Sequence, residues 1–148
     1  MYFKSLLTNR RAIREFQDKE IPLHVLKEII QDTCLAPTAS NLQPIKFVII
    51  HDREQIKKLS DESKKSLLDD LVRDPDLPLK QYEGALRDGQ FNVFYNAPCL
   101  VLFVGPKDVY SLDVDCGLTA TYFMFSATSK GLGPCWIGLG AHIRDKQI

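Results

Sequence analysis

The chain carries a polar turn, Ala36-Pro37-Thr38-Ala39-Ser40-Asn41-Leu42-Gln43-Pro44-Ile45, directly before an apolar stretch. Proline, threonine, serine and asparagine in one short segment interrupt regular secondary structure. The side-chain amides of Asn41 and Gln43 can each donate and accept hydrogen bonds, as the edge of a heterocyclic ring requires. The turn therefore predicts contact with a ligand that carries such a ring.

A cluster of arginines precedes this turn by about 25 residues, in the run Arg10-Arg11-Ala12-Ile13-Arg14. Guanidinium groups bind phosphate oxygens in a planar, bidentate way and keep their charge at physiological pH. The cluster therefore indicates a phosphorylated ligand. Taken alone, an arginine run is also typical of a solvated helix end, and the turn is also typical of a helix stop.

Together, the two segments resemble the nitroreductase family of FMN-dependent oxidoreductases. That family has the patterns Arg-Arg-Ser-x-Arg-x-Phe and Ala-Pro-Ser-x-x-Asn-x-Gln-Pro-Trp, separated by a helix, and here residues 10–16 and 36–45 match them. A third match is Gly131-Leu132-Gly133-Pro134-Cys135-Trp136-Ile137-Gly138, which is similar to the family's Gly-Leu-Gly-Ser-x-Trp-Ile-Gly segment. The matches span nearly the whole chain.

The resemblance implies which residues bind FMN. Arg10 and Arg11 would meet the ribityl phosphate, and Arg14 would approach the pyrimidine edge of the flavin and tune its potential. The turn would be supplied to the flavin by a partner chain, and residues 134–139 would pack against one face of the ring. The full set of expected cofactor-binding residues is Arg10, Arg11, Ala12, Arg14, Pro37, Thr38, Ala39, Ser40, Asn41, Gln43, Pro134, Cys135, Trp136, Ile137, Gly138 and Leu139.

The chain departs from the family pattern at several positions. Ala12 replaces a serine whose hydroxyl contacts phosphate, Thr38 replaces another serine, and Ile45 replaces a tryptophan. The family's carboxy-terminal extension, with a strand and a basic residue that reaches the phosphate, is expected to be short or missing. Arg144 and Lys146 lie too close to residues 136–138 for that role. Either a minimal family member or a truncated form of a longer protein fits this pattern.

The resemblance also implies an activity. NADH or NADPH would transfer a hydride to flavin N5, and a nitroaromatic, quinone or similar small oxidant would then be reduced, in a ping-pong sequence. No catalytic side chain is expected, because the reacting atom belongs to the flavin. The alternative is a flavin-binding protein with little or no catalytic activity. The phosphate-binding loops of ATPases and of Rossmann domains are both missing from the sequence.

Composition limits the other classes of function. A chain of 148 residues that is 45% hydrophobic and 26% charged fits a single globular domain over residues 1–148. Because 19 basic and 19 acidic side chains balance, no global field attracts nucleic acid or an anionic membrane. The apolar runs are much shorter than the roughly 18 residues of a membrane helix. We expect no nucleic-acid partner and no membrane span.

The four cysteines, Cys34, Cys99, Cys116 and Cys135, are widely spaced and have no histidine at metal-ligand spacing. Neither a metal site nor a dithiol redox centre is expected, and Cys135 is interpreted as a small buried hydrophobe. The amino-terminus does not resemble a signal peptide. The expected location is therefore cytoplasmic.

Periodicity predicts helices over residues 2–8, from Pro22 to Pro37, over one or two segments within 53–72, and over 113–130. Largely buried strands are expected at 45–50 and 98–105, with a further strand over 133–140; residues 79–95 have the weakest pattern. The helix over 113–130 is apolar on more than one side, so it is expected in a domain centre or at a subunit interface. One stripe of this helix carries Val114, Leu118, Thr121, Tyr122, Phe125 and Thr128.

Helices alternating with two or three strands indicate an α+β or α/β sandwich. The resemblance narrows this to an α+β fold of the nitroreductase type, a three-layer α/β/α sandwich with a small, mostly antiparallel sheet between helical layers. It further implies an intertwined homodimer with FMN at the interface. The helix over 113–130 would then be a dimer element.

Overall fold

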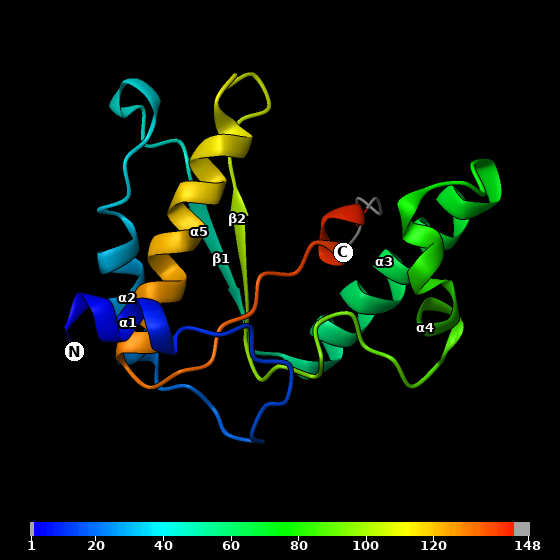
Figure 1. Cartoon of the computed structure of the whole chain (residues 1–148), viewed down its shortest axis with the longest axis horizontal. Helices are drawn as coiled ribbons and strands as arrows, with labels where there is room; N and C mark the ends of the chain where they lie inside the picture. Colours follow the sequence, from blue (N-terminus) through cyan, green and yellow to red (C-terminus); the bar gives the residue numbers. More distant parts are fainter. Residues whose placement is uncertain (1, 144–148) are drawn as a thin grey trace. The chain divides into compact units, whose positions relative to one another are not determined.

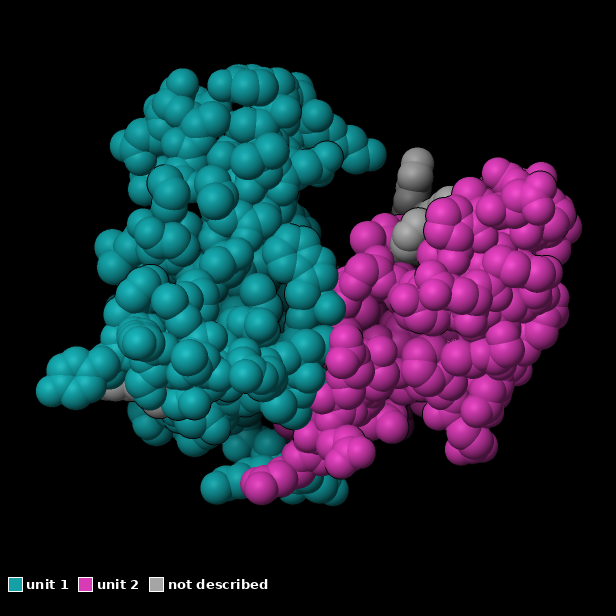
Figure 2. Space-filling view, viewed as in Figure 1, with its two compact units in different colours: residues 1–13, 18–49, 101–136 teal, residues 14–17, 50–100, 137–148 magenta. Residues whose placement is uncertain are grey.

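The computed structural model describes residues 2–143 and divides into two compact units, drawn in different colours in Figure 2. Unit 1 comprises residues 1–13, 18–49 and 101–136, and unit 2 comprises residues 14–17, 50–100 and 137–148. Each unit is described by itself below. The expectation of one domain over the whole chain stays a prediction.

Unit 1 contains most of the helices that were expected on either side of the arginines and the polar turn. Its elements are α1 (Phe3–Asn9), α2 (Leu23–Thr33), the 3₁₀ turn η1 (Ala39–Asn41), most of β1 (Lys46–Ile50), most of β2 (Leu100–Val104) and α5 (Leu112–Ser129). The strands β1 and β2 pair antiparallel in a two-stranded sheet (Figure 1). The predicted α+β class is confirmed.

The helix ends follow the local signals in the sequence. Asp52 caps α3 (Arg53–Arg73), where its carboxylate accepts a hydrogen bond from the Gln55 N–H at 2.9 Å. Gly131 ends α5 with φ of 78°, a left-handed conformation that glycine adopts without a steric penalty. The Leu132 N–H then donates to the Ala127 carbonyl at 3.0 Å. These capping signals explain why the predicted helix boundaries are close to the observed ones.

In unit 1, α5 packs against α2 and against the sheet. Leu26 and Ile29 of α2 are fully buried, and the Ser126 hydroxyl of α5 donates to the Asp32 carboxylate at 2.6 Å. Phe123 of α5 meets Phe103 of β2 edge to face at 5.7 Å between ring centroids. Edge-to-face aromatic pairs contribute about 0.5–1.5 kcal/mol beyond their buried area. These contacts fix α5 relative to the strands and to α2.

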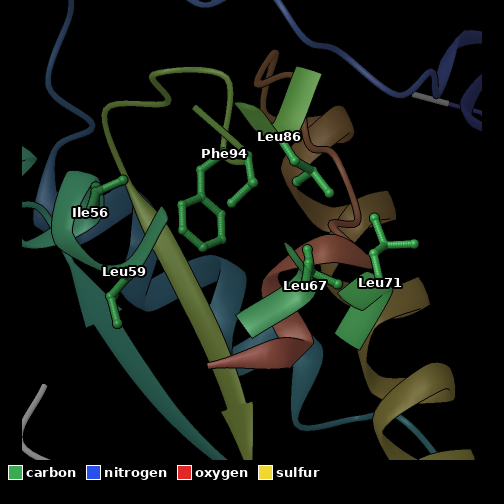
Figure 3. Packing of buried hydrophobic residues seen from close by; sticks show 7 residues of the cluster. Ile56, Leu59, Leu67, Leu71, Leu86 and Phe94 are labelled. Carbon is green, nitrogen blue, oxygen red and sulfur yellow. The ribbon is translucent and has the colours of Figure 1, made fainter. Parts of the chain in front are cut away.

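Unit 2 is built around one long helix and a closed apolar core. Its elements are α3 (Arg53–Arg73), the 3₁₀ turn η2 (Pro78–Tyr82), α4 (Glu83–Arg87) and the 3₁₀ turn η3 (Leu139–His142). A single helix therefore covers the segment where one or two were expected. Figure 3 shows the core side chains pointing toward one another; the cluster is Ile56, Leu59, Leu67, Leu71, Leu86, Val93 and Phe94.

The apolar stripe expected on α5 is half-buried at Thr121, Phe125 and Thr128 and exposed at its other three positions in the single chain. Val114 is 66% exposed, Leu118 is 42% exposed and Tyr122 is 41% exposed. The buried positions are instead Asp115, Thr119, Ser126 and Ala127. Because α5 is apolar around most of its circumference, hydrophobic periodicity does not identify which side faces the rest of the unit.

The two strands are also less buried than the sequence predicts. Val48 of β1 and Val104 of β2 are 45% and 40% exposed, and no residue of either strand is fully buried. Phe47 and Phe103 stack edge to face at 5.2 Å. Since side chains alternate between the two faces of a strand, the valines lie on the face opposite to these phenylalanines. The apolar composition of the strands predicted that both faces are buried, but the face that carries the valines is partly exposed.

The strand predicted over residues 133–140 is not formed. Residues 132–137 belong to no helix or strand, and the 3₁₀ turn η3 begins at Leu139. Pro134 has no N–H to donate and Gly133 precedes it, and both residue types disfavour pairing in a ladder. Trp136 is 54% exposed rather than a core side chain, and Cys135 is half-buried.

Arg144 and Lys146, which were considered as phosphate-binding residues, lie outside the described residues. Within residues 2–143, every helix is too short or too polar to cross a lipid bilayer.

Candidate functional site

The arginine cluster of unit 1 begins where α1 ends. The Arg10 N–H donates to the Leu6 carbonyl at 3.0 Å and closes the last turn of α1. Arg10 is half-buried, whereas Arg11 and Ala12 are exposed. The Arg11 guanidinium donates to the Arg10 carbonyl at 2.8 Å. Among residues 2–143, no carboxylate pairs with either arginine, so both cations remain available to an anion.

The segment after the arginines lies beside the segment 133–136. The Ile13 N–H donates to the Pro134 carbonyl at 3.2 Å. A Cβ atom at Gly133 would lie 2.6 Å from Cγ1 and 2.9 Å from Cβ of Ile13, so only glycine allows this approach. The structure therefore brings together two of the three segments that the sequence singled out.

The polar turn of unit 1 is held in an uncommon backbone conformation. Ser40, Asn41 and Gln43 have φ values of 51°, 54° and 48°, in the left-handed region that residues other than glycine rarely adopt. Inside the turn, the Asn41 N–H donates to the Thr38 carbonyl and the Gln43 N–H donates to Thr38 Oγ1, both at 3.0 Å. These bonds satisfy the backbone, so the turn presents its side chains outward.

The side-chain amides of Asn41 and Gln43 are exposed and have no hydrogen-bond partner within the described part of the chain. Each amide therefore keeps its donors and its acceptor for a ligand. Pro37 is exposed beside them, and Thr38 and Ala39 are half-buried. This arrangement matches the requirement for recognising the edge of a heterocycle.

The turn and Trp136 lie on different sides of α5. The Ala39 N–H donates to Oδ1 of Asp115 at 3.0 Å, whereas the tip of the Trp136 ring lies 3.8 Å from where a Cβ atom of Gly117 would be. Residues two apart on a helix point about 200° apart around its axis. The body of α5 therefore stands between the turn and the side where Trp136 packs.

In unit 2, Arg14 lies over an aromatic side chain. Its guanidinium carbon is 5.7 Å from the centroid of the Tyr95 ring, within the range of a cation–π contact. Tyr95 and Asn96 have φ values of 55° and 54°, and a left-handed conformation is unusual for a tyrosine. The Phe91 ring meets Tyr95 edge to face at 6.1 Å. Arg14 is thus held by aromatic packing and has no carboxylate partner within residues 2–143.

The remaining predicted residues, Ile137, Gly138 and Leu139, also belong to unit 2. The Ser63 hydroxyl of α3 donates to the Leu139 carbonyl, which attaches η3 to α3. Apart from its two chain neighbours, no described residue lies within 4 Å of where a Cβ atom of Gly138 would be. The backbone at Gly138 therefore has open space beside it.

Two of the four cysteines, Cys99 and Cys116, have raised pKa values and are therefore poor nucleophiles. Burial raises the pKa of Cys99 to about 11, so this thiol is neutral at physiological pH. Burial, together with the carboxylates of Asp113 and Asp115, also raises the pKa of Cys116. Neither thiol has the lowered pKa that a nucleophilic cysteine needs.

Sequence reasoning missed two residues next to the predicted set. Asp115 was overlooked because the residues around it in α5 were assigned to an apolar stripe, although a carboxylate among apolar neighbours was itself a signal. Tyr95 falls in the weakly patterned segment, and its contact with Arg14 joins residues far apart in the sequence. Only a fold could reveal that contact.

Comparison with known proteins identifies a family and a fold. A model of the nitroreductase family matches residues 7–145. A curated protein of Archaeoglobus fulgidus, provisionally named NADH dehydrogenase/NAD(P)H nitroreductase, is 27% identical over 138 residues, which are 90% of this chain. The match covers 66% of that relative, so this chain spans just under two thirds of its length.

Two crystal structures of nitroreductases with bound FMN have the same fold as this chain. The one from Bacteroides fragilis aligns with a TM-score of 0.79 at 20% identity and covers 92% of this chain and 69% of that one. The one from Desulfitobacterium hafniense also aligns with a TM-score of 0.79 at 20% identity, covering 95% of this chain and 71% of that one. At such identities the likeness concerns the fold alone.

Proposed function

The chain belongs to the nitroreductase family, and we propose on that premise that it is the subunit of an FMN-dependent oxidoreductase. It takes electrons from NADH or NADPH and reduces a small oxidant such as a nitroaromatic or a quinone. Relatives named for NAD(P)H nitroreductase activity and neighbours crystallised with FMN support the proposal. The observation that carries it is the set of exposed amides and unpaired arginines at the family's flavin-binding positions.

The residues present fit the chemistry of FMN. Arg10 and Arg11 supply cations for the phosphate, and no carboxylate within residues 2–143 competes for them. Asn41 and Gln43 offer donors and acceptors for the polar edge of the ring. Gly138 leaves space beside its backbone for the ring to approach.

When bound, FMN supplies the redox chemistry, because its N5 atom can accept a hydride from a nicotinamide and the electrons can then pass to the oxidant in a ping-pong sequence. The protein would bind FMN and orient it. Arg14, held over Tyr95, would place a positive charge near the ring and so stabilise the negative charge that the ring gains when it is reduced. No side chain is required to take or give a proton in this proposal.

We place the flavin between two copies of this chain. The turn and the Trp136 segment lie on different sides of α5, so two copies related by a twofold axis can combine the turn of one with the arginines of the other. The exposed Val114, Leu118 and Tyr122 follow one another at intervals of four along α5. A stripe of this kind favours burial against a partner helix.

The absorption spectrum of the purified chain with added FMN tests this function. We expect a bound yellow flavin that NADH or NADPH bleaches under anaerobic conditions and that a nitroaromatic or a quinone reoxidises. Bound flavin that neither nicotinamide reduces would leave a flavin-binding protein without this activity. A chain that binds no FMN as a dimer would contradict the proposal.

The arginines are tested by the double variant Arg10→Ala/Arg14→Ala. Each charge-assisted contact contributes roughly 1.5–3 kcal/mol, so the double variant should bind FMN at least about a hundredfold more weakly. Arg73→Ala is the matched control, since Arg73 is an exposed arginine at the end of α3. Equal affinity in the double variant and in the control would contradict the role assigned to these arginines.

A further inference from the structure

Asp115 is the most deeply buried carboxylate that the structure describes, at 1% exposure in the first turns of α5. Its Oδ1 atom accepts the Ala39 N–H at 3.0 Å, and its Oδ2 atom accepts the Ser111 hydroxyl at 2.8 Å. Burying a carboxylate costs several kcal/mol unless hydrogen bonds replace its water. Both oxygens have such bonds, and one of them reaches a residue 76 positions away in the sequence.

The bond to Ala39 reaches the polar turn at the first residue of η1. Directly after it come Ser40 and Asn41, with Gln43 two residues further on, all in the left-handed region. Conformations of this kind cost about 1–3 kcal/mol each and persist only where surrounding contacts impose them. The other hydrogen bonds of residues 38–43 are internal, through Thr38 and Ala39. Among the described residues, Asp115 is thus the side chain that ties the turn to another element.

We propose that Asp115 is a positioning residue that fixes the conformation of the turn, so that Asn41 and Gln43 present their amides to the ligand. It does not touch the ligand itself. The identity of the ligand as FMN rests on the function proposed above. The effect of Asp115 on the conformation of the turn does not rest on that function, because it depends on the folded chain alone.

A purely local role for Asp115 makes a different prediction. A carboxylate near the start of α5 stabilises the helix through its dipole and through Ser111, without any need for Ala39. Ser111→Ala removes the local bond and keeps the bond to Ala39. Asp115→Asn keeps an oxygen that accepts the Ala39 N–H and an NH₂ that donates to Ser111. Asp115→Ala removes both bonds.

The first test follows hydrogen exchange of the Ala39 amide by NMR, without flavin. We expect Asp115→Ala to accelerate exchange at Ala39 by about tenfold or more, and Asp115→Asn and Ser111→Ala to stay within about threefold of the original chain. Ser126→Ala is the matched control, because it removes a hydroxyl–carboxylate bond elsewhere on α5. Unchanged exchange at Ala39 in Asp115→Ala would overturn the proposal.

The second test measures FMN affinity in the same variants. Loss of preorganisation should weaken binding at least about tenfold in Asp115→Ala, with recovery in Asp115→Asn. Equal affinity in the original chain and in Asp115→Ala would overturn the positioning role and leave the proposed function intact. If the original chain binds no FMN, the proposed function fails, and Ala39 exchange still decides whether Asp115 holds the turn.

A further variant covers the case in which Asp115→Ala does not fold. Ala39→Pro removes the same hydrogen bond from the opposite side while the carboxylate stays. Thr38 has φ of −132° and ψ of 155°, the extended conformation that a following proline requires. We expect the FMN affinity of this variant to fall at least about tenfold. Affinity equal to that of the original chain would overturn the proposal.

Discussion

The two units of this chain differ in how their longest helices, α3 in unit 2 and α5 in unit 1, bury their apolar side chains. Unit 2 closes a core of leucine, isoleucine, valine and phenylalanine within itself. In unit 1, helix α5 buries Asp115, Thr119 and Ser126 and leaves Val114, Leu118 and Tyr122 exposed. Apolar surface left in water is unfavourable by about 25 cal/mol per Å². Unit 2 therefore buries its core residues within itself, whereas unit 1 exposes apolar side chains on α5 that a partner could cover.

The largest expected effect concerns the closed core of unit 2. Leu67 is fully buried there, so Leu67→Ala should lower the free energy of unfolding by about 2–5 kcal/mol. Leu118→Ala on α5, at 42% exposure, should cost less than about 1 kcal/mol at protein concentrations where the chain is monomeric. Urea denaturation followed by circular dichroism measures both values. Equal losses would remove the contrast between the units.

The exposed stripe of α5 predicts the next effect. Leu118→Glu places a charge in the proposed contact between two copies, so it should raise the dimer dissociation constant by about a hundredfold without loss of helix. Val72→Glu is the matched control, because Val72 is an apolar residue of unit 2 at 75% exposure. Sedimentation equilibrium measures the dissociation constants. Similar values for the two variants would show that the stripe is not the interface.

A smaller effect is expected from the buried lysine of unit 2. The Lys64 ammonium donates to the carbonyls of Asp88 and Phe91 at 2.8 and 2.9 Å, and so fixes the segment that leads to Tyr95. Lys64→Met keeps the apolar stem and removes both bonds, which should cost about 1–3 kcal/mol of stability. The exposed Lys65, changed to methionine, should cost less than about 0.5 kcal/mol. A loss in Lys64→Met as small as in Lys65→Met would contradict this role.

The smallest effect concerns thiol reactivity and leaves stability unchanged. Burial raises the pKa of Cys99 to about 11, so the reactive thiolate is scarce below that pH. With iodoacetamide at pH 8, the exposed Cys34 should react first and Cys99 should react slowly. Mass spectrometry of the labelled peptides follows both residues as pH rises toward 11. Rapid labelling of Cys99 at pH 8 would contradict its burial.

Local signals explain why much of the fold could be predicted. Asp52 capped α3 and Gly131 ended α5 as expected, because a cap depends on the few residues around it. The side that α5 buries could not be predicted, since its apolar residues surround the helix. The strand expected over 133–140 failed for a related reason. A strand forms only where a neighbouring strand pairs with it, and composition does not predict that pairing.

The candidate site divides in the same way. The turn and the arginines were predicted from residue types, and the structure leaves their side chains available. Asp115 and Tyr95 were missed because their roles come from contacts with Ala39 and Arg14, which are distant in the sequence. The binding roles of the predicted residues, Pro134 to Leu139 included, stay predictions.

The central claim is that each flavin site combines the arginines of one copy with the turn of another. The most direct test joins Arg10→Ala/Arg11→Ala in one copy with Asn41→Ala/Gln43→Ala in the other, using two affinity tags to isolate the mixed dimer. One site of this dimer contains both defects and the other contains neither. We predict that each variant alone binds no FMN and that the mixed dimer binds about half as much as the original dimer. A mixed dimer that binds no FMN would contradict the account.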